Sequence, residues 1–414
     1  MSLATNAVSS DPVIQLIPPQ TAGSRTPSVM IVAGEASSDL HAAALARALR
    51  ARHSDVQIFG MGGAHLRDAG VETIVDSETE ASVMGITEVL GSLGKLYRAF
   101  RALVVAAKKR RPDVVVLVDF PDFNLLLARL LKRLNVKVFY YVSPQLWAWR
   151  RGRIKTMRRY VNEVAVIFPF EEEFYRGSGM KATFVGHPFV DRAPVSVMRR
   201  EFFSQFNIDP ERPVIALLPG SRKAELNSLL LPMLQAIDRV SLVRPGIQAV
   251  IPVAGTLSFE QVEEFVAEHA PVNACVRVIE QQARELMTFS DAAIVASGTA
   301  TVEAALAGVP FFVVYKLAPL TFRLAKLLVR GIKNFAMVNL IARKPFVTEL
   351  LQDEVTPERL AEELERILGD KGYAASLQRQ LLELRDSLKR GGGEVPAAQR
   401  AADLVLDCIG KEEK

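Results

Sequence analysis

The sequence predicts two doubly wound α/β domains, each built on a parallel sheet, that face each other across a central cleft. Short apolar runs rich in β-branched residues alternate with stretches of helical periodicity, as expected for strands covered by helices on both faces. The alternation occurs twice, and a stretch punctuated by prolines separates the two series. In such sheets ligands bind outside the carboxyl ends of the strands, so the loops after the strands carry the functional prediction.

The first series predicts a domain over residues 28–190. Its helices are expected at 38–50, 94–111 and 123–134. Its strands are expected at 29–33, 56–59, 114–118, 136–142 and 164–168. The second series predicts a domain over 213–370. Its helices are expected at 224–240, 259–269 and 299–307, and its strands at 214–218, 248–253, 277–279, 292–296 and 311–315.

The remaining segments complete the predicted organisation. Residues 1–27, rich in Ser, Thr, Pro and Gln, are expected to form a flexible leader. Residues 191–212 form the linker between the domains. Residues 371–414 are helical apart from three glycines at 391–393, and they are expected to pack back on the first domain or on a partner subunit. The sequence therefore also allows a homodimer.

Composition excludes several classes of protein. With 49% hydrophobic residues, the 414-residue chain can bury a core in each domain. Its two cysteines, Cys275 and Cys408, form neither a disulfide framework nor a four-thiolate metal site, and a reducing cytoplasm is the default. No secretory signal or membrane span is recognisable. No Asp-x-Asp, His-Glu-x-x-His or Cys-x-x-Cys motif supports a metal, and no cofactor is expected.

The net charge of +5 hides a strong asymmetry. Residues 91–162 hold 17 Lys or Arg against three acids, and residues 304–348 hold seven basic residues and no acid. Both stretches contain amphipathic helical patterns, which favour attachment to an anionic membrane surface over nucleic acid, for which no binding signature is present. The predicted membrane contacts are Phe100, Leu103, Arg323, Leu324, Lys326, Leu327, Leu328 and Arg330.

Two loops of the second domain are suited to a nucleotide diphosphate. Gly220, Ser221 and Arg222 follow a strand and open a helix, where free backbone N–H groups and a guanidinium can bind phosphate. A second loop repeats this arrangement with Ser297, Gly298 and Thr299, and Glu303 lies one turn into the helix that follows. A carboxylate at that position can accept hydrogen bonds from ribose hydroxyls, although a favourable acid in a first helical turn explains it equally well.

Acidic loops follow two strands of the first domain. Acids and hydroxyls after the opening strand suit the hydroxyl groups of a sugar better than a phosphate; these acceptor-side candidates are Glu35, Ser37, Asp39 and His41. The loop at 119–124 reads DFPDFN, and either Asp119 or Asp122 could serve as a general base. Helix capping is the alternative role for both aspartates.

Six segments together resemble the lipid-A-disaccharide synthase family. They are VAGEASSD (32–39), FGMGG (59–63), DFPDFN (119–124), YVSPQLWAWR (141–150), FVGHP (184–188) and LLPGSR (217–222). The resemblance implies an inverting glycosyltransferase with two Rossmann-like domains (GT-B). It further implies that UDP-2,3-diacylglucosamine donates its sugar to the 6-hydroxyl of 2,3-diacylglucosamine 1-phosphate, at the inner face of the Gram-negative cytoplasmic membrane.

The resemblance also assigns roles to single residues. It implies that Asp122 is the catalytic base, that Arg222 lies in the UDP-binding loop, and that Glu303 and Asn339 lie on the nucleotide side. Ser38 and Phe120 depart from the family, which usually has Gly and Ala there. Two other readings stay open at this point: a transferase or epimerase acting on a soluble UDP-sugar, and a non-enzymatic basic protein that binds membranes or RNA.

Overall fold

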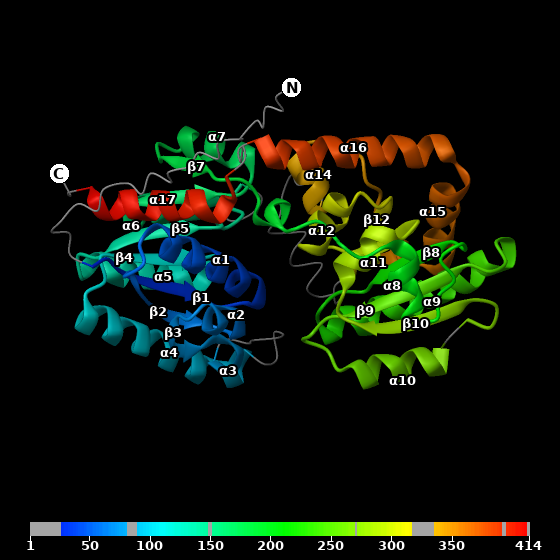
Figure 1. Ribbon diagram of the computed structural model, residues 1–414, viewed down its shortest axis with the longest axis horizontal. Coiled ribbons are helices and arrows are strands. Elements are labelled where there is room, and N and C mark those ends of the chain that lie inside the picture. The colour runs from blue at the N-terminus through cyan, green and yellow to red at the C-terminus, as the bar shows by residue number, and fades with distance from the viewer. Residues whose placement is uncertain are drawn as a thin grey trace, which may run out of the picture.

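The computed structural model describes residues 26–80, 89–147, 151–269, 271–316, 335–390 and 395–411. Within these residues, two parallel sheets of seven and six strands form two α/β domains that lie side by side (Figure 1). The predicted fold class is confirmed. The predicted leader at 1–27, apart from its last two residues, and the predicted membrane contacts Arg323, Leu324, Lys326, Leu327, Leu328 and Arg330 lie outside the described residues.

The first sheet has the order β3-β2-β1-β4-β5-β6-β7, with every neighbouring pair parallel. Its strands are β1 Ser28–Ala33, β2 Gln57–Gly62, β3 Glu72–Asp76, β4 Val114–Val118, β5 Lys137–Tyr141, β6 Glu163–Val166 and β7 Ala182–Phe184. All the strands expected in this domain are present. The sequence did not predict β3 and β7, which are the two edges of the sheet.

Helices cover both faces of this sheet. Successive residues of β1 alternate between two cores: Ile31 packs in the core that includes α1 and α17, whereas Val32 packs in the core that includes α4 and α5. The helices of this domain are α1 Ala36–Arg52, α2 Ala64–Asp68, α3 Ser77–Glu80, α4 Val89–Arg110, α5 Pro121–Arg133, α6 Ile154–Tyr160 and α7 Pro169–Gly177, to which α17 Ala397–Gly410 is added.

The position of α4 corrects one predicted membrane contact. Leu103 is fully buried in the core beneath α4, so the prediction that it faces a membrane is wrong. Phe100 is partly buried, and its ring centroid lies 5.5 Å from that of Phe123 on α5 in an edge-to-face arrangement. The periodic apolar residues of this helix therefore mainly face the sheet, which is the usual position for an amphipathic helix of a globular domain.

The second sheet has the order β10-β9-β8-β11-β12-β13, again parallel throughout. Its strands are β8 Val214–Leu218, β9 Gln248–Val253, β10 Cys275–Glu280, β11 Ala292–Ala296, β12 Phe311–Tyr315 and β13 Glu349–Leu351. One face is covered by α9 Lys223–Val243, α10 Phe259–His269 and α15 Pro357–Gly369. The other is covered by α11 Ala283–Phe289, α12 Ala300–Ala307, α14 Met337–Ala342 and α16 Lys371–Arg390.

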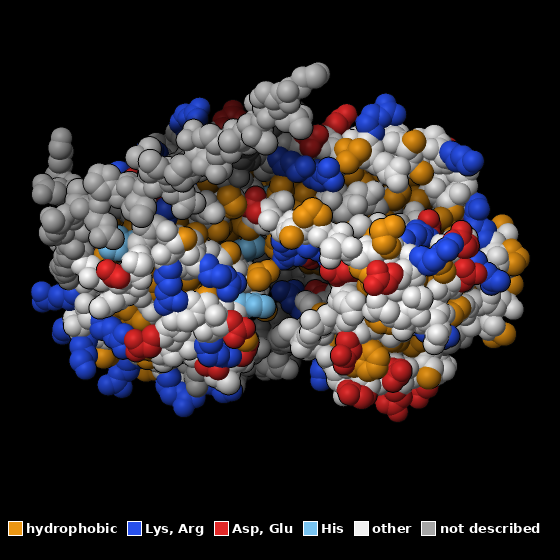
Figure 2. Space-filling view, viewed as in Figure 1, with side chains coloured by type: hydrophobic (Ala, Val, Ile, Leu, Met, Phe, Trp, Pro, Cys, Tyr) orange, Lys and Arg blue, Asp and Glu red, His pale blue; other side chains and the backbone are white. Residues whose placement is uncertain are grey.

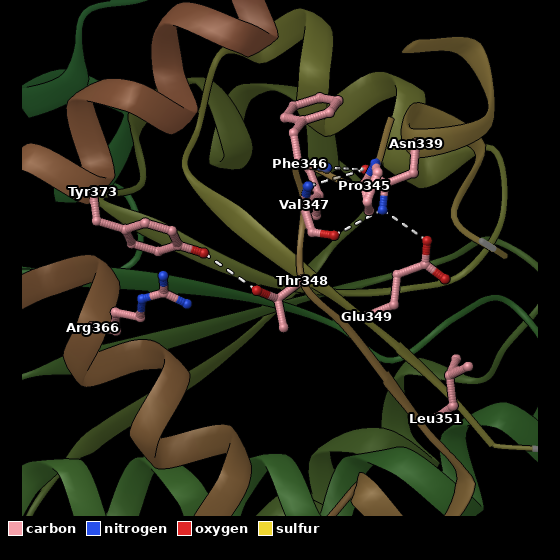
Figure 3. A pocket seen from close by; sticks show the side chains of 9 residues that line it. All are labelled: Asn339, Pro345, Phe346, Val347, Thr348, Glu349, Leu351, Arg366 and Tyr373. Atoms are coloured by element: carbon pink, nitrogen blue, oxygen red, sulfur yellow. Dashed lines mark hydrogen bonds between the residues drawn. The ribbon is translucent and has the colours of Figure 1, made fainter. Parts of the chain in front are cut away.

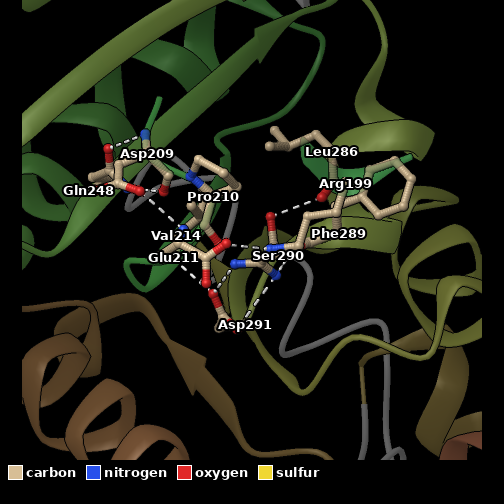
Figure 4. A network of polar contacts seen from close by, with 10 residues as sticks. All are labelled: Arg199, Asp209, Pro210, Glu211, Val214, Gln248, Leu286, Phe289, Ser290 and Asp291. Carbon is tan, nitrogen blue, oxygen red and sulfur yellow. Dashed lines mark hydrogen bonds and ion pairs between the residues drawn. The ribbon is translucent and has the colours of Figure 1, made fainter. Parts of the chain in front are cut away.

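Much of the predicted linker belongs to the second domain. Within it, α8 Arg199–Ser204 buries Phe202 and Phe203. The guanidinium of Arg199 donates to the carbonyls of Phe289 and Pro210, and to the carboxylate of Asp291 at 2.9 Å (Figure 4). Asp291 in turn accepts from the backbone N–H of Val214 at 2.8 Å, at the start of β8. These bonds hold residues 199–212 against the second domain. The segment that connects the two domains is therefore shorter than predicted and consists of residues 192–198.

The end of the chain makes a second connection between the domains. After α16 on the second domain, α17 lies on the first, against α1 and β5 (Figure 1). Arg52 on α1 donates to Asp403 on α17 at 2.7 Å, and Nζ of Lys137 on β5 donates to the carbonyl of Cys408 at 3.0 Å. Of the two predicted C-terminal helices, α17 thus packs back on the first domain of the same chain, whereas α16 stays on the second.

We expect Arg199→Ala to lower the free energy of unfolding by about 1–3 kcal/mol, because two backbone carbonyls and Asp291 lose a charged donor. Arg200→Ala is the matched control: its pair with Glu211 is 79% and 73% exposed, so its loss should leave the free energy of unfolding almost unchanged. Urea unfolding followed by circular dichroism measures both variants. Equal stability of the two would contradict the anchoring role of Arg199.

Candidate functional site

The order of the strands identifies one switch point in each sheet. In the first sheet the connections leave β1 and β4 in opposite directions, and in the second sheet the same holds for β8 and β11. Loops at the carboxyl ends of such neighbouring strands open a crevice between them. Figure 2 shows the molecule hollowed between the two domains. The four loops at 34–35, 119–120, 219–222 and 297–299 are those in which the sequence predicted chemistry.

The loop after β4 has an unusual backbone. Asp119 and Phe120 both adopt left-handed φ angles, of 46° and 48°, which residues other than glycine rarely adopt. The carbonyl of Asp119 accepts from the Tyr140 hydroxyl at 2.6 Å and from the Asn124 amide at 2.7 Å. Surroundings that fix a loop in this way are typical of functional sites.

Phe120, one of the departures from the family, lies against the loop after β1. A Cβ atom added to Gly34 would come within 2.3 Å of the Phe120 ring, so only glycine fits at that position. The aromatic side chain therefore joins the two loops of the first-domain switch point by direct contact.

The two aspartates of this loop differ in their surroundings. Burial and, to a smaller extent, the negative charge of Glu35 raise the pKa of Asp119 to about 7, against the opposing effect of the hydrogen bond from the Phe120 backbone N–H. Asp122 lies one turn away on α5, where its side chain is 73% exposed and forms an ion pair with Arg153. A carboxylate that titrates near neutral pH is suited to accept a proton during catalysis, so this pKa makes Asp119 a candidate base beside Asp122.

The acceptor-side candidates do not all point into the crevice. Glu35 is exposed at the start of α1 and close enough to Asp119 to raise its pKa, whereas Ser37 is half-buried on the first turn. Asp39 is buried and accepts from the backbone N–H groups of Gly63 and His65, at 2.7 and 2.9 Å, at the start of α2. The structure thus brings Glu35 and Asp119 together and uses Asp39 to join α1 to α2.

His41 lies deeper in the first domain. Its ring centroid is 5.4 Å from that of Phe189, and burial together with the charge of Arg192 lowers its pKa to about 4. His187, which belongs to the FVGHP segment, is also buried, and its pKa is lowered to about 3. Both rings are therefore neutral at physiological pH.

The loop after β8 presents a glycine and a cation at the start of α9. Gly220 has a φ of +109°, and a Cβ there would meet the carboxylate of Glu225 at 2.2 Å. The Arg222 guanidinium pairs with Glu225 at 3.3 Å but is 68% exposed. The backbone N–H of Ser221 donates to the same carboxylate at 3.1 Å. An incoming phosphate would find an exposed guanidinium here, whose one ion pair within the described residues is with Glu225.

The loop after β11 leaves Gly298 and Thr299 exposed at the start of α12, while Ser297 is half-buried and donates to the carbonyl of Phe335 at 3.4 Å. Exposed backbone N–H groups at a helix start suit an anion. Glu303, in the first turn of α12, accepts from Arg192 at 2.6 Å.

Asn339 has a different position from the one predicted. Its side chain is fully buried, accepts from the N–H groups of Phe346 and Val347, and donates to the Val347 carbonyl and to Glu349 (Figure 3). With every hydrogen-bonding site occupied, Asn339 shapes the wall of a pocket of about 440 Å³ that Thr348, Glu349 and Tyr373 also line. Its predicted contact with a nucleotide would require these bonds to break.

Glu171 is a buried residue that the sequence reading missed. It accepts from the Ser143 hydroxyl at 3.0 Å, the Trp147 indole at 3.1 Å and the Phe168 backbone at 3.1 Å, and burial raises its pKa to about 7. The only signal in the sequence is an acid in the first turn of a helix, a position that ordinarily indicates capping. The structure gives it the further role of holding the loop after β5.

Two facing parallel-sheet domains with phosphate-suited loops on one side and acids on the other define the GT-B class of glycosyltransferases and related epimerases. UDP-N-acetylglucosamine 2-epimerase from Neisseria meningitidis has this fold, at 13% identity and a TM-score of 0.61 over 93% of this chain and all of that one. MurG from Acinetobacter baumannii is also similar, at 16% identity and a TM-score of 0.53 over 92% of this chain and all of that one.

Sequence similarity then narrows the class to one family. Residues 29–392 match the model of the lipid-A-disaccharide synthetase family, and the chain belongs to it. The lipid-A-disaccharide synthases of Myxococcus xanthus and Geobacter sulfurreducens are 44% and 41% identical, over 92% and 93% of this chain and 98% of each relative. That of Coxiella burnetii is 39% identical over 92% of this chain and 98% of its own. The protein is thus a glycosyltransferase.

We expect Asp119→Asn to lower kcat by about 10²–10⁴-fold, because it removes a proton acceptor with a pKa near 7, and Asp122→Asn to lower it less than tenfold. In the wild type, kcat/KM should rise with pH and level off above about 7, as Asp119 loses its proton. The Asp122→Asn variant should keep that profile. Steady-state rates between pH 5 and 9 measure both effects.

Stability supplies an independent check of the Asp119 pKa. Between about 4 and about 7 the folded state keeps a proton that the unfolded state has lost, because the folded pKa of about 7 lies above the ordinary 3.8. Asp119 therefore makes the free energy of unfolding fall as pH rises through this window and leaves it level above it. Asp119→Asn should remove this contribution and Asp122→Asn should not. If Asp122→Asn lowers kcat more than Asp119→Asn does, Asp122 is the base and the assignment to Asp119 is wrong.

Proposed function

We propose that this protein transfers 2,3-diacylglucosamine from UDP-2,3-diacylglucosamine to the 6-hydroxyl of 2,3-diacylglucosamine 1-phosphate, releasing UDP and a β(1→6)-linked disaccharide. Membership of the lipid-A-disaccharide synthetase family over residues 29–392 is the observation that carries the proposal. The geometry supports it, because acids follow the switch-point strands of the first sheet and phosphate-suited loops follow those of the second.

The acceptor side supplies the proton acceptor. An inverting transfer needs a base that removes the proton of the attacking hydroxyl while the oxygen attacks the anomeric carbon from the face opposite the leaving group. Asp119 fits this role better than Asp122, because its pKa lies near 7 and its backbone is fixed by Tyr140 and Asn124. Glu35, beside it, keeps the basicity of Asp119 high through its negative charge.

The donor side stabilises the leaving UDP. Negative charge develops on the diphosphate as the glycosidic bond breaks, and Arg222 and the starts of α9 and α12 can stabilise it. Exchanging Glu225 for phosphate would free the Arg222 guanidinium for two parallel hydrogen bonds. Glu303 would accept from the ribose hydroxyls. Among the described residues, no group of three or more His, Cys, Asp or Glu is arranged to hold a metal ion.

The test measures UDP release with diacylated and with non-acylated substrates, each with and without EDTA. The proposal expects release only when both substrates are diacylated, at a rate that EDTA changes by less than about twofold. Release from non-acylated UDP-sugars at a similar rate would point instead to a transferase or epimerase for soluble sugars. No release with any substrate, together with retention on RNA or lipid, would point to a binding protein.

We also propose that the enzyme acts in the cytoplasm and attaches peripherally to the inner face of the cytoplasmic membrane. In the part of the chain that the structure describes, every helix is too short or too polar to span a membrane. Tyr97, Arg101, Val105 and Lys108 follow one exposed stripe of α4, with Tyr97 66% and Val105 56% exposed. Lys and Arg side chains gather on this side of the first domain, whereas acids gather near α10 (Figure 2).

We expect the double variant Tyr97→Ser/Val105→Ser to bind vesicles of phosphatidylglycerol about tenfold more weakly, because two apolar side chains no longer enter the interface. The matched control is Leu242→Ser/Val243→Ser at the end of α9 in the second domain, where both side chains are about equally exposed, at 69% and 70%. Vesicle co-sedimentation measures both. If the control loses as much binding as the α4 variant, the stripe does not form the membrane contact.

A further inference from the structure

The ion pair between Arg192 and Glu303 joins the two domains beside the crevice. Glu303 lies in the first turn of α12, directly after the exposed loop at 297–299. Arg192 immediately follows the short 3₁₀ helix Pro188–Asp191 of the first domain. Nη1 of Arg192 donates to Oε1 of Glu303 at 2.6 Å, and the two side chains are only 27% and 26% exposed. Partial burial makes this pair less screened by water than a surface ion pair.

Contacts within the first domain hold the Arg192 guanidinium in place. Its central carbon lies 3.9 Å from the ring centroid of Phe189, which is the distance of a close cation–π contact. The Phe189 ring itself packs against two buried imidazoles, with centroids 5.4 Å from His41 and 5.0 Å from His187. Because both histidines are neutral, they bring no positive charge against the guanidinium. The position of the Glu303 carboxylate is thus set by the first domain.

Among the residues that the structure describes, Arg192 alone donates to Glu303, and it occupies one carboxylate oxygen. Oε2 accepts no hydrogen bond from the described residues, whereas Oε1 is fixed by Arg192. A carboxylate held by one oxygen leaves the other free to accept from a hydroxyl, and a fixed acceptor loses less side-chain freedom when a ligand binds. Because the Arg192–Glu303 ion pair joins the two domains, a change in the orientation of one domain relative to the other would break it.

We propose that Arg192 is a positioning residue for the nucleotide: it orients Glu303 toward the ribose hydroxyls and so links ribose recognition to the arrangement of the two domains. The inference rests on the proposed ribose contact of Glu303 and adds to it a residue from the opposite domain. Arg192 touches neither the reacting atoms nor the ribose, and it acts through the carboxylate.

The test compares the binding of UDP and of 2′,3′-dideoxy-UDP to the full-length protein by calorimetry. Wild-type protein should prefer UDP by about tenfold, because dideoxy-UDP lacks the hydroxyls that Glu303 recognises. Arg192→Ala should lose most of this preference while its affinity for dideoxy-UDP changes less than about twofold. Arg192→Lys should recover part of the preference, because an ammonium can still pair with one carboxylate oxygen. The matched control, Arg200→Ala, should behave as wild type, since its ion pair lies at the surface.

Glu303→Ala separates the two proposals, because alanine offers no acceptor to the ribose hydroxyls. If Glu303→Ala binds UDP no better than dideoxy-UDP and adding Arg192→Ala causes no further loss, both the ribose contact and the role of Arg192 are supported. If Glu303→Ala keeps the full preference, the ribose contact itself is wrong. If Glu303→Ala loses the preference but Arg192→Ala keeps it, or if Arg192→Ala weakens both ligands equally, the role of Arg192 is overturned and the ion pair is structural. The lysine variant supplies the same comparison should Arg192→Ala fold poorly.

Discussion

The rest of the structure depends on the two places where the chain passes between the domains. The first passage, residues 192–198, lies between a 3₁₀ helix that belongs to the first domain and a helix, α8, that belongs to the second. The second follows α16 and ends with α17 on the first domain. Together they hold the carboxyl ends of two parallel sheets toward one hollow. The acid that titrates near neutral pH, Asp119, lies in the first domain, and the helix starts suited to phosphate lie in the second.

The two sides of the crevice use opposite electrostatic devices. In the first domain, burial and a neighbouring acid raise the pKa of Asp119, so that a carboxylate can accept a proton near neutral pH. In the second, Arg222 remains largely exposed and pairs with Glu225, a partner that an anionic ligand can replace. The raised pKa of Asp119 depends on the exclusion of water, whereas phosphate binding by Arg222 depends on access from the solvent. Asp119 accordingly lies in a loop of left-handed backbone, and Arg222 lies at the exposed start of a helix.

The sequence predicted every central strand, because these strands are buried on both faces and appear as unbroken apolar runs. It missed β3, β7 and β13, which lie at sheet edges, are three to five residues long and consist mainly of partly buried residues. An edge strand has no continuous apolar signal, since one of its sides is not covered by the sheet.

The site was predictable at the level of loops but less so at the level of side chains. The positions after the strands were identified from small, acidic and hydroxyl residues, whereas the direction of each side chain depends on contacts distant in sequence. Asp39 accepts a hydrogen bond at the start of α2, Asn339 accepts one from the backbone of Val347, and Leu103 is buried against the sheet. Arg192 carries no local pattern at all, because its importance arises only from the approach of α12 across the crevice.

The position of α17 bears on how the protein is made. Ala401, Ala402 and Val405 complete the apolar face of the first sheet beside α1, yet the whole second domain precedes them in the sequence. A ribosome delivers the N-terminal domain first, at about 5–20 residues per second, so this domain emerges with one face of its core incomplete. That face stays exposed until the second domain and α17 have been synthesised. During synthesis the chain therefore exposes an apolar surface that the folded protein buries, and a truncation before α17 would leave that surface uncovered.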